Sequence, residues 1–291
     1  MKVRKLNEKV NSEIQIQTPP FGDRGAGNIL DNIISQKQLE IYESRQLKTI
    51  LELEIEPFFR RKCISLKDNL QASDSGIIAE FKRKSPSKGW IHENANVLEI
   101  TTGYAEAGAS GLSILTDELF FGGKPEDLKL TRPHVSCPIL RKDFIVDKYQ
   151  LFEAKAWGAD VILLIAAALT PQKTKSLGKQ AKSLGMEVLL EIHNKQELEH
   201  INEFVDIVGV NNRNLKTFEV NTNISKELAG LIPAEFAKIS ESGISKPETV
   251  MELREYGYQG FLMGENFMKE ENPAATLVRF ISSLHPAQGN S

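Results

Sequence analysis

From residue 77 to residue 263 the chain alternates short β-rich apolar runs with amphipathic stretches, and the alternation repeats eight times. The amphipathic stretches carry apolar residues at helical spacing. Links rich in small residues, such as 107–111 and 184–185, precede several apolar runs, and glycine there can take the left-handed conformation that ends a helix. Such repetition predicts a parallel sheet. We predict its strands at residues 77–81, 112–116, 138–142, 160–165, 186–191, 206–211, 237–241 and 260–263.

The number of repeats indicates the fold. Eight strand-helix units in about 210 residues match a (β/α)8 TIM barrel, whereas an open doubly wound sheet usually has fewer strands. Before the first strand, apolar residues recur at helical spacing over 29–55, with Asn28 as an N-cap and Pro57 as a stop. We therefore predict an α/β protein, a (β/α)8 TIM barrel with an N-terminal helical extension.

The polar segment 1–28 reads as a loosely ordered arm, and residues 29–291 as a single barrel domain with its preceding helices. The arm ends in TPPFGDRGAG at 18–27, whose glycines resemble a nucleotide-binding fingerprint. No predicted strand precedes them, which argues against dinucleotide binding.

The first predicted strand leads directly into a cluster of cations at residues 82–88. Side chains alternate along a strand, so Glu80 and Lys82 project to the same side as Ile78. Residues 85–89 have turn chemistry, so we expect the cations on a loop that can close over an anion.

Several other predicted strands also end in polar residues, and barrel enzymes build their active sites at the carboxyl ends of the strands. Alternation places each of these side chains in a row that can point into the barrel. One interpretation is a layer of salt bridges that closes the barrel. We favour a catalytic ring, in which a lysine with a lowered pKa acts as acid and a carboxylate with a raised pKa acts as base. Its members are Glu80, Lys82, Lys142, Glu191, Asn211 and Glu241.

Glycine follows both of the last two predicted strands, at Gly243 and Gly264. Barrels often bind phosphate through backbone N–H groups of these two loops, and glycine lets the main chain approach the anion. Two ordinary turns are the alternative, but their position after strands seven and eight favours a phosphate site.

Composition narrows the choice of partner. The chain is 41% hydrophobic and 26% charged, with a net charge of −3 and a pI near 6.1, which argues against nucleic-acid binding through bulk charge. Cys63 and Cys137 lie far apart without metal-ligand spacing, which fits a reducing cytoplasm and no metal site. No run approaches the roughly 18 apolar residues of a membrane span. We expect a small phosphorylated partner, no nucleic acid and no membrane, and we interpret His193 as structural or solvent-exposed.

Motifs follow or span several of the predicted strand ends. They are IAEFKRKSPS at 78–87, LTDELFF at 115–121, RKDFI at 141–145, LEIH at 190–193, GVNNRNL at 209–215 and SESGI at 240–244. Together these motifs resemble the indole-3-glycerol-phosphate synthase family of tryptophan biosynthesis. The resemblance covers roughly residues 28–285, and the motifs occur in the family's order on successive strands. The chain departs from the common pattern at Asn214 and at 266–267.

The resemblance implies a carboxy-lyase that converts 1-(2-carboxyphenylamino)-1-deoxyribulose 5-phosphate to indole-3-glycerol phosphate, CO2 and water. It implies Lys142 as the acid at the ketone and Glu191 as the base of the dehydration. Lys82 is then either a second acid or a clamp on the substrate carboxylate. Glu80, Asn211 and Glu241 would orient these groups. No metal or organic cofactor is implied.

The resemblance also implies substrate contacts. Arg213 would pair with the aryl carboxylate, and two phenylalanines would hold the aromatic ring, although ordinary core packing is their alternative role. The implied substrate-binding residues are Ser85, Phe121, Phe144, Arg213, Ser242, Gly243, Leu262, Gly264 and Glu265.

Two other functions compete with this one. A phosphoribosylanthranilate isomerase would share the phosphate loops but would more naturally use a Cys/Asp pair where this chain has Glu80 and Glu191. A non-catalytic phosphate-binding barrel would have no need to keep the charged ring together. We expect a monomer as the default oligomeric state.

Overall fold

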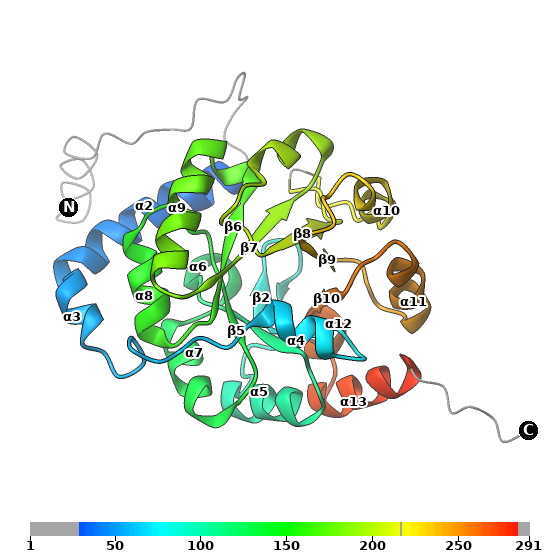
Figure 1. Cartoon of the computed structure of the whole chain (residues 1–291). Helices are drawn as coiled ribbons and strands as arrows, with labels where there is room; N and C mark the ends of the chain where they lie inside the picture. The colour runs from blue at the N-terminus through cyan, green and yellow to red at the C-terminus, as the bar shows by residue number, and fades with distance from the viewer. Residues whose placement is uncertain (1–28, 216, 285–291) are drawn as a thin grey trace, which may run out of the picture.

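The computed structural model describes residues 29–215 and 217–284 of the 291-residue chain. Eight parallel strands close into a barrel, with β1 hydrogen-bonded to both β4 and β10, and helices surround the strands (Figure 1). The predicted (β/α)8 barrel is confirmed. Its strands are β1 (Ile77–Phe81), β4 (Gly111–Leu115), β5 (Ile139–Lys142), β6 (Val161–Ile165), β7 (Glu187–Ile192), β8 (Ile207–Asn211), β9 (Ala237–Glu241) and β10 (Gly260–Met263).

Every one of these strands lies within one residue of a predicted strand at each end. The agreement has a simple cause, because parallel strands covered on both faces form near-continuous apolar runs. All five residues of β1, β4 and β6 are buried. A short antiparallel pair, β2 (Lys84–Ser85) with β3 (Gly89–Trp90), stands apart from the barrel in the loop after β1.

Helices connect most of the barrel strands. Between β7 and β8 the connection is instead the 3₁₀ helix η3 (Lys195–His200), and two further 3₁₀ turns are η1 (Arg132–His134) and η2 (Ala166–Ala168). The α-helices that follow β1 are α5 (Val97–Glu106), α6 (Glu118–Phe121), α7 (Pro125–Thr131), α8 (Tyr149–Trp157), α9 (Pro171–Ser183), α10 (Asn223–Ala229), α11 (Pro247–Glu255), α12 (Glu265–Met268) and α13 (Pro273–Leu284).

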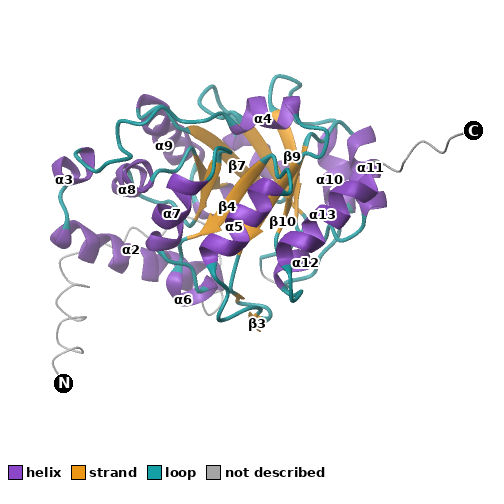
Figure 2. Ribbon diagram, turned by 90° about the horizontal axis from the view of Figure 1, so that it is seen from below, coloured by secondary structure: helices purple, strands orange, loops and turns teal. Residues whose placement is uncertain are grey.

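From residue 29 onward, where the description begins, three helices precede the barrel: α2 (Ile29–Leu47), α3 (Ile50–Glu54) and α4 (Leu66–Ala72). The predicted helical extension is present, but it divides at Thr49, whose side chain and that of Glu52 cap α3 reciprocally. The proposed Asn28 cap and the arm 1–28 lie outside the described residues. Figure 2 shows α4 at the opposite end of the barrel from β3 and α6.

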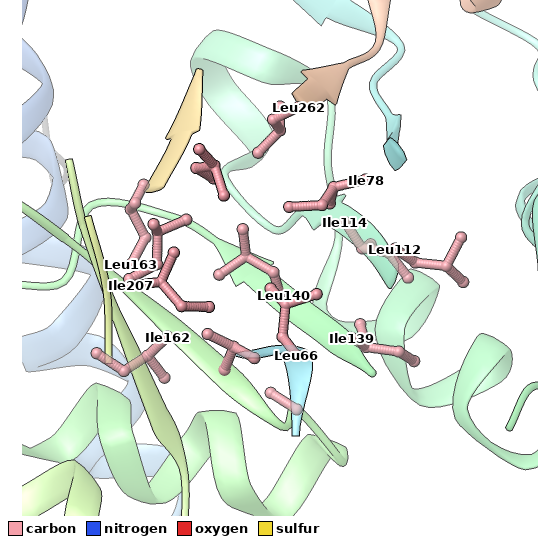
Figure 3. Packing of buried hydrophobic residues seen from close by; sticks show 14 of the residues in the cluster. Leu66, Ile78, Leu112, Ile114, Ile139, Leu140, Ile162, Leu163, Ile207 and Leu262 are labelled. Atoms are coloured by element: carbon pink, nitrogen blue, oxygen red, sulfur yellow. The ribbon is translucent and has the colours of Figure 1, made fainter. Parts of the chain in front are cut away.

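The barrel interior is a packed apolar core. Apolar side chains of the barrel strands pack together in this core and are almost completely buried (Figure 3). Its centre includes Ile78, Leu140, Leu163, Ile207 and Leu262. Close packing of this kind gives the strand ends fixed positions, so polar side chains beyond the core are held in a defined arrangement.

Candidate active site

The carboxyl ends of the strands surround a cavity of about 140 Å³. Alternation along each strand brings the polar end residue to the side of the inward apolar ones, as β5 does with Leu140 and Lys142. All six members of the predicted ring line this cavity: Glu80, Lys82, Lys142, Glu191, Asn211 and Glu241.

Lys142 is at the centre of the ring. Its Nζ donates to Oε2 of Glu191 at 3.1 Å and to Oε2 of Glu241 at 2.5 Å. Both carboxylates are almost completely buried. One ammonium group therefore holds together the ends of three different strands.

A second pair lies at the end of β1, with Glu80 on the strand and Lys82 just beyond it. Lys82 Nζ donates to Oε1 of Glu80 at 2.8 Å, and Ser113 Oγ on the neighbouring strand donates to Oε2 at 3.2 Å. These contacts and the charge of Lys142 outweigh the burial of Glu80 and lower its pKa. Glu80 is thus held as an anion between the two lysines.

The charges set the pKa values of the central groups. Burial opposes the charge on Lys142, but the surrounding carboxylates outweigh burial and raise its pKa. Burial likewise opposes the charge on Glu191, yet Lys142 and His193 lower its pKa below the ordinary value. Burial raises the pKa of Glu241 to about 7, and the neighbouring carboxylates add to this while Lys142 opposes it.

These directions contradict the expected pattern of a lysine with a lowered pKa and a base with a raised one. Lys142 is surrounded by carboxylates, not by cations, so its ammonium form is favoured. The carboxyl group that burial and like charge destabilise as an anion is Glu241, not Glu191.

The loop after β9 has an unusual backbone. Ser242 and Gly243 are consecutive residues with positive φ, +67° and +75°. Ser242 lines the cavity. Asn212, completely buried, donates through Nδ2 to the carbonyl oxygens of Glu241 and Ser242 at 3.0 and 3.1 Å. This amide fixes the loop, and sequence reasoning assigned it no role.

The loop after β10 contacts the first strand. A Cβ added at Gly264 would lie 2.9 Å from Cβ of Glu80, so only glycine fits there without displacement. Gly243 and Gly264 flank the cavity without being among its lining residues, whereas Leu262 and Glu265 line it.

Arg213 lines the cavity and is partly engaged within the protein. Its guanidinium donates to the carbonyl of Phe218 at 3.2 Å and lies 3.8 Å from the carboxylate of Glu265. Asn211 Oδ1 accepts the backbone N–H of Arg213 at 3.0 Å. The end of β8 thereby orients this arginine toward the cavity.

The apolar wall of the cavity has two sources. Phe121 and Phe144 line it with ring centroids 6.0 Å apart, which fits an aromatic slot. Helix α2 adds Ile29, Leu30 and Ile33, which sequence reasoning did not assign to the site. Ser85 also lines the cavity.

Lys37 attaches α2 to the barrel. It is 3% exposed, and its Nζ lies 2.9 Å from Asp117, 3.0 Å from Asp143 and 2.6 Å from Glu40. Burial opposes its charge, but these carboxylates outweigh burial and raise its pKa. The sequence signal for this attachment was a lysine on the apolar side of a helix, and sequence reasoning overlooked it.

The cations that follow β1 do not all face the cavity. Arg83 forms a two-point ion pair with Asp127, and Lys84 donates to the carbonyl of Leu119 at 2.8 Å. Lys88 lies 3.9 Å from Glu265 across the cavity mouth. The expected anion-closing loop is therefore partly incorrect, because two of its cations bind other parts of the protein.

His193 is closer to the site than expected. Its Nε2 lies 3.2 Å from Oε1 of Glu191, and its side chain is 11% exposed. The solvent-exposed alternative for His193 is therefore wrong, whereas the structural one stays a prediction. The Leu-Glu-Ile-His spacing was the available signal, since Glu191 and His193 share a side of the strand.

The described residues contain neither a metal-binding cluster nor a membrane-spanning helix. In residues 29–215 and 217–284, no three His, Cys, Asp or Glu side chains are grouped so as to hold a metal ion. No helix in that part of the chain combines the length and apolar character needed to cross a membrane.

Comparison with known proteins identifies curated relatives over most of the chain. An indole-3-glycerol phosphate synthase of Bacteroides thetaiotaomicron is 51% identical over 257 residues, covering 88% of this chain and 99% of that protein. The enzyme of the same name from Bordetella pertussis is 41% identical over 260 residues, covering 88% and 99%.

Similarity to solved structures supports the fold but not the function. A tryptophan synthase α-subunit variant from Pyrococcus furiosus has a TM-score of 0.54 at 19% identity, covering 73% of this chain and 98% of that chain. A chain of the tryptophan synthase complex of the same organism has a TM-score of 0.53 at 18% identity, with the same coverage.

The family model described as indole-3-glycerol phosphate synthase matches residues 30–280. With a match over most of its length, the chain belongs to the indole-3-glycerol phosphate synthase family of tryptophan biosynthesis.

Proposed function

We propose that the cavity at the carboxyl ends of the strands is where this chain carries out the reaction of its family. In that reaction 1-(2-carboxyphenylamino)-1-deoxyribulose 5-phosphate closes to indole-3-glycerol phosphate with loss of CO2 and water. The observation that carries the proposal is Lys142, held between two buried carboxylates inside an otherwise largely apolar cavity. Such a group can deliver a proton to a substrate oxygen where water is excluded.

Ring closure begins with a bond from the aromatic carbon to the ketone carbon, and the ketone oxygen takes a proton. Lys142 is the donor in this proposal. Its raised pKa keeps it protonated at neutral pH, so it gives up the proton only as the oxygen becomes strongly basic. The bond to the carboxylate then breaks, CO2 leaves, and its electron pair returns to the ring system.

Dehydration needs an acid at the departing hydroxyl and a base at the neighbouring C–H. We assign Glu191 as the base, because its lowered pKa keeps it ionised. Lys82 is either the second acid or the clamp on the substrate carboxylate. Single-turnover kinetics of Lys82→Ala distinguish these roles, since loss of the acid slows the last step and loss of the clamp weakens binding.

Two buried polar atoms support substrate binding here. Oγ of Ser85 and Oε1 of Glu241 have no hydrogen-bond partner among the described residues. Buried polar groups are normally paired, so substrate hydroxyl or carboxylate groups are natural partners. Glu80 and Asn211 orient the neighbouring lysine and arginine in this scheme.

The remaining contacts follow from the shape of the cavity. Phe121 and Phe144 hold the aromatic ring, and Arg213 pairs with the aryl carboxylate through its planar fork. Backbone N–H groups of the loops after β9 and β10 bind the phosphate, which involves Ser242, Gly243, Gly264 and Glu265. The positive φ at Ser242 supports this, since strained backbone clusters at ligand sites.

Incubation of the purified chain with the carboxyphenylamino substrate tests the proposal, with indole fluorescence as the readout. We expect a fluorescent product together with release of CO2. An isomerase would process phosphoribosylanthranilate instead, and a non-catalytic barrel would bind the substrate unchanged, so either result would contradict the proposal.

We also propose that the enzyme works as a monomer in the cytoplasm on a small phosphorylated substrate, without nucleic acid. Free cysteines at Cys63 and Cys137 support a reducing compartment. Sedimentation at the assay concentration tests the oligomeric state, and a dimer would contradict it.

A further inference from the structure

His193 connects the catalytic ring to an acidic residue outside the cavity. Its Nδ1 lies 3.3 Å from Oε2 of Glu197, and its Nε2 lies 3.2 Å from Oε1 of Glu191. Glu191 in turn lies 3.1 Å from Nζ of Lys142. His193 and Glu197 are absent from the lining of the cavity, so these two groups approach Glu191 from outside it.

The exposed fraction of the side chain increases from Glu191 through His193 to Glu197. The side chain of Glu191 is 3% exposed, that of His193 is 11% and that of Glu197 is 15%. Glu197 is also held in place, because it accepts the backbone N–H of His193 at 2.7 Å and Nδ2 of Asn194 at 2.8 Å. The Glu197 carboxylate is therefore held in a fixed position, and it is the most exposed of the three side chains Glu191, His193 and Glu197.

Each nitrogen of the imidazole faces a carboxylate. Nδ1 is hydrogen-bonded to Glu197, and Nε2, which is buried, lies 3.2 Å from Oε1 of Glu191. A ring with nitrogens facing two carboxylates has the geometry that passes a proton from one to the other.

The reaction proposed above needs such a route. The ketone oxygen gains one proton, the departing hydroxyl gains a second, and the base removes only one from carbon. With the substrate carboxylate ionised, substrate plus one H⁺ gives indole-3-glycerol phosphate, CO2 and H2O. One proton per turnover must therefore come from the solvent to restore the lysines, and Glu191 can return only the one it removed.

We propose that Glu197 and His193 carry this solvent proton to Glu191, which hands it to Lys142, so that His193 is a positioning and relay residue for the base. In each transfer one N–H or O–H bond breaks as the next forms, and no oxidant or second substrate is involved. The proposal rests on the proposed function, because the proton requirement comes from that reaction.

The charges around His193 are compatible with a relay. Burial disfavours the imidazolium, but Glu191 and Glu197 outweigh burial and raise the pKa of His193 to about 10. Glu191 faces it from β7 and Glu197 from η3, while Lys142 lies beyond Glu191. The imidazole is thus protonated at neutral pH, and it transfers its proton once Lys142 has given up its own.

Variants of the full-length chain test the relay, with steady-state turnover measured in H2O and in D2O. For His193→Ala we expect kcat to fall by about 10²-fold, the lower end of the range for acid-base groups, with KM little changed. Added imidazole should restore much of kcat. Glu197→Gln keeps an oxygen that can accept the backbone N–H of His193 but no longer takes up a proton, so we expect a lower kcat and a larger solvent isotope effect. Glu199→Gln, on the exposed side of η3, is the matched control and should behave as wild type.

The outcomes separate the two proposals. If the wild-type chain forms no indole product, the proposed function fails and the relay with it. If the wild type turns over while Glu197→Gln matches it in kcat and isotope effect, the relay alone is wrong and protons arrive through the cavity mouth. Loss of kcat in His193→Ala that imidazole does not restore would make His193 a structural residue. Should His193→Ala fail to fold, Glu197→Gln decides the question, because His193 is intact in it.

Discussion

Oε2 of Glu241 lies 2.5 Å from Nζ of Lys142, yet the pKa of Glu241 is raised to about 7. Burial is the largest cause of this raised pKa, and the negative charges of Glu191 and Glu80 raise it further. One ammonium group cannot compensate three buried carboxylates at once. Of the three, Glu241 is the one that binds a proton most readily, and Glu191 stays ionised.

This relationship gives stability a defined pH dependence. Between the ordinary pKa of 4.5 and the folded value of about 7, the native chain keeps a proton on Glu241 that the unfolded chain has released. The stabilisation is complete below the lower value and is lost as pH rises to the upper one, by up to about 1.4 kcal/mol per pH unit. Glu241→Gln cannot titrate and should lack this loss.

Urea unfolding of the wild type and of Glu241→Gln at about pH 5 and about pH 8 measures the difference. We expect the variant to gain stability relative to the wild type as pH rises. A difference that stays constant between the two pH values would mean that Glu241 titrates normally in the folded chain.

Lys142→Ala should remove the group that we propose as the acid of ring closure. We expect kcat to fall by at least about 10²-fold while the chain still folds, because general acid catalysis contributes on this scale. Indole fluorescence measures the turnover. Lys175→Ala is the control, since Lys175 is 55% exposed on α9 and pairs with Glu203. Normal turnover by Lys142→Ala would assign the acid to another group.

Lys37→Met should loosen α2 from the barrel. The change leaves Asp117 and Asp143 as buried carboxylates without their shared cation, which typically destabilises a protein by about 3–5 kcal/mol. KM should also rise, because α2 supplies part of the cavity wall. Denaturant unfolding and steady-state kinetics check the two effects.

Arg45→Ala provides the comparison for Lys37→Met. Arg45 on the same helix pairs with Asp147 but is 44% exposed, and such exposed pairs contribute about 0–1 kcal/mol. Equal stability losses in the two variants would show that Lys37 does not attach α2 in the manner described.

The fold was predictable because its signal is local and repeated. Each buried parallel strand is a short apolar run, so even β4, predicted at 112–116 and found at Gly111–Leu115, was misplaced by a single residue. The meeting of the polar strand ends in one cavity was predictable for a related reason. Once the strands are counted, closure of the barrel brings Lys142 and Glu191 together although 49 positions separate them.

Features that depend on several distant partners were not predictable. The pKa of Lys142 rises because three carboxylates converge on it, and local sequence does not reveal how charges balance in three dimensions. Lys37 forms ion pairs with Asp117 and Asp143, which lie in two different loops. Arg83 likewise forms an ion pair with Asp127, and no pattern in the segment 82–88 indicates this partner.

Gly243→Ala should weaken binding of the substrate phosphate. Gly243 has φ +75°, and an added Cβ would lie 2.3 Å from Cγ1 of Val220, so the loop after β9 must shift. We expect KM and the inhibition constant of inorganic phosphate to rise about tenfold, the effect of about 1.4 kcal/mol of lost binding. Gly264 is a less specific target, because a Cβ there meets Glu80.

Gly185→Ala separates backbone strain from the effect on phosphate. Gly185 has φ +78° with nothing within 4 Å of an added Cβ, and it lies in the link between α9 and β7, away from the cavity. Gly185→Ala should lose about 1–2 kcal/mol of stability, since alanine resists the left-handed conformation. Gly243→Ala should lose at least as much, because its Cβ also meets Val220. Only Gly243→Ala should change KM and phosphate inhibition. If the two variants behave alike in the kinetic assay, the loop after β9 does not bind the phosphate.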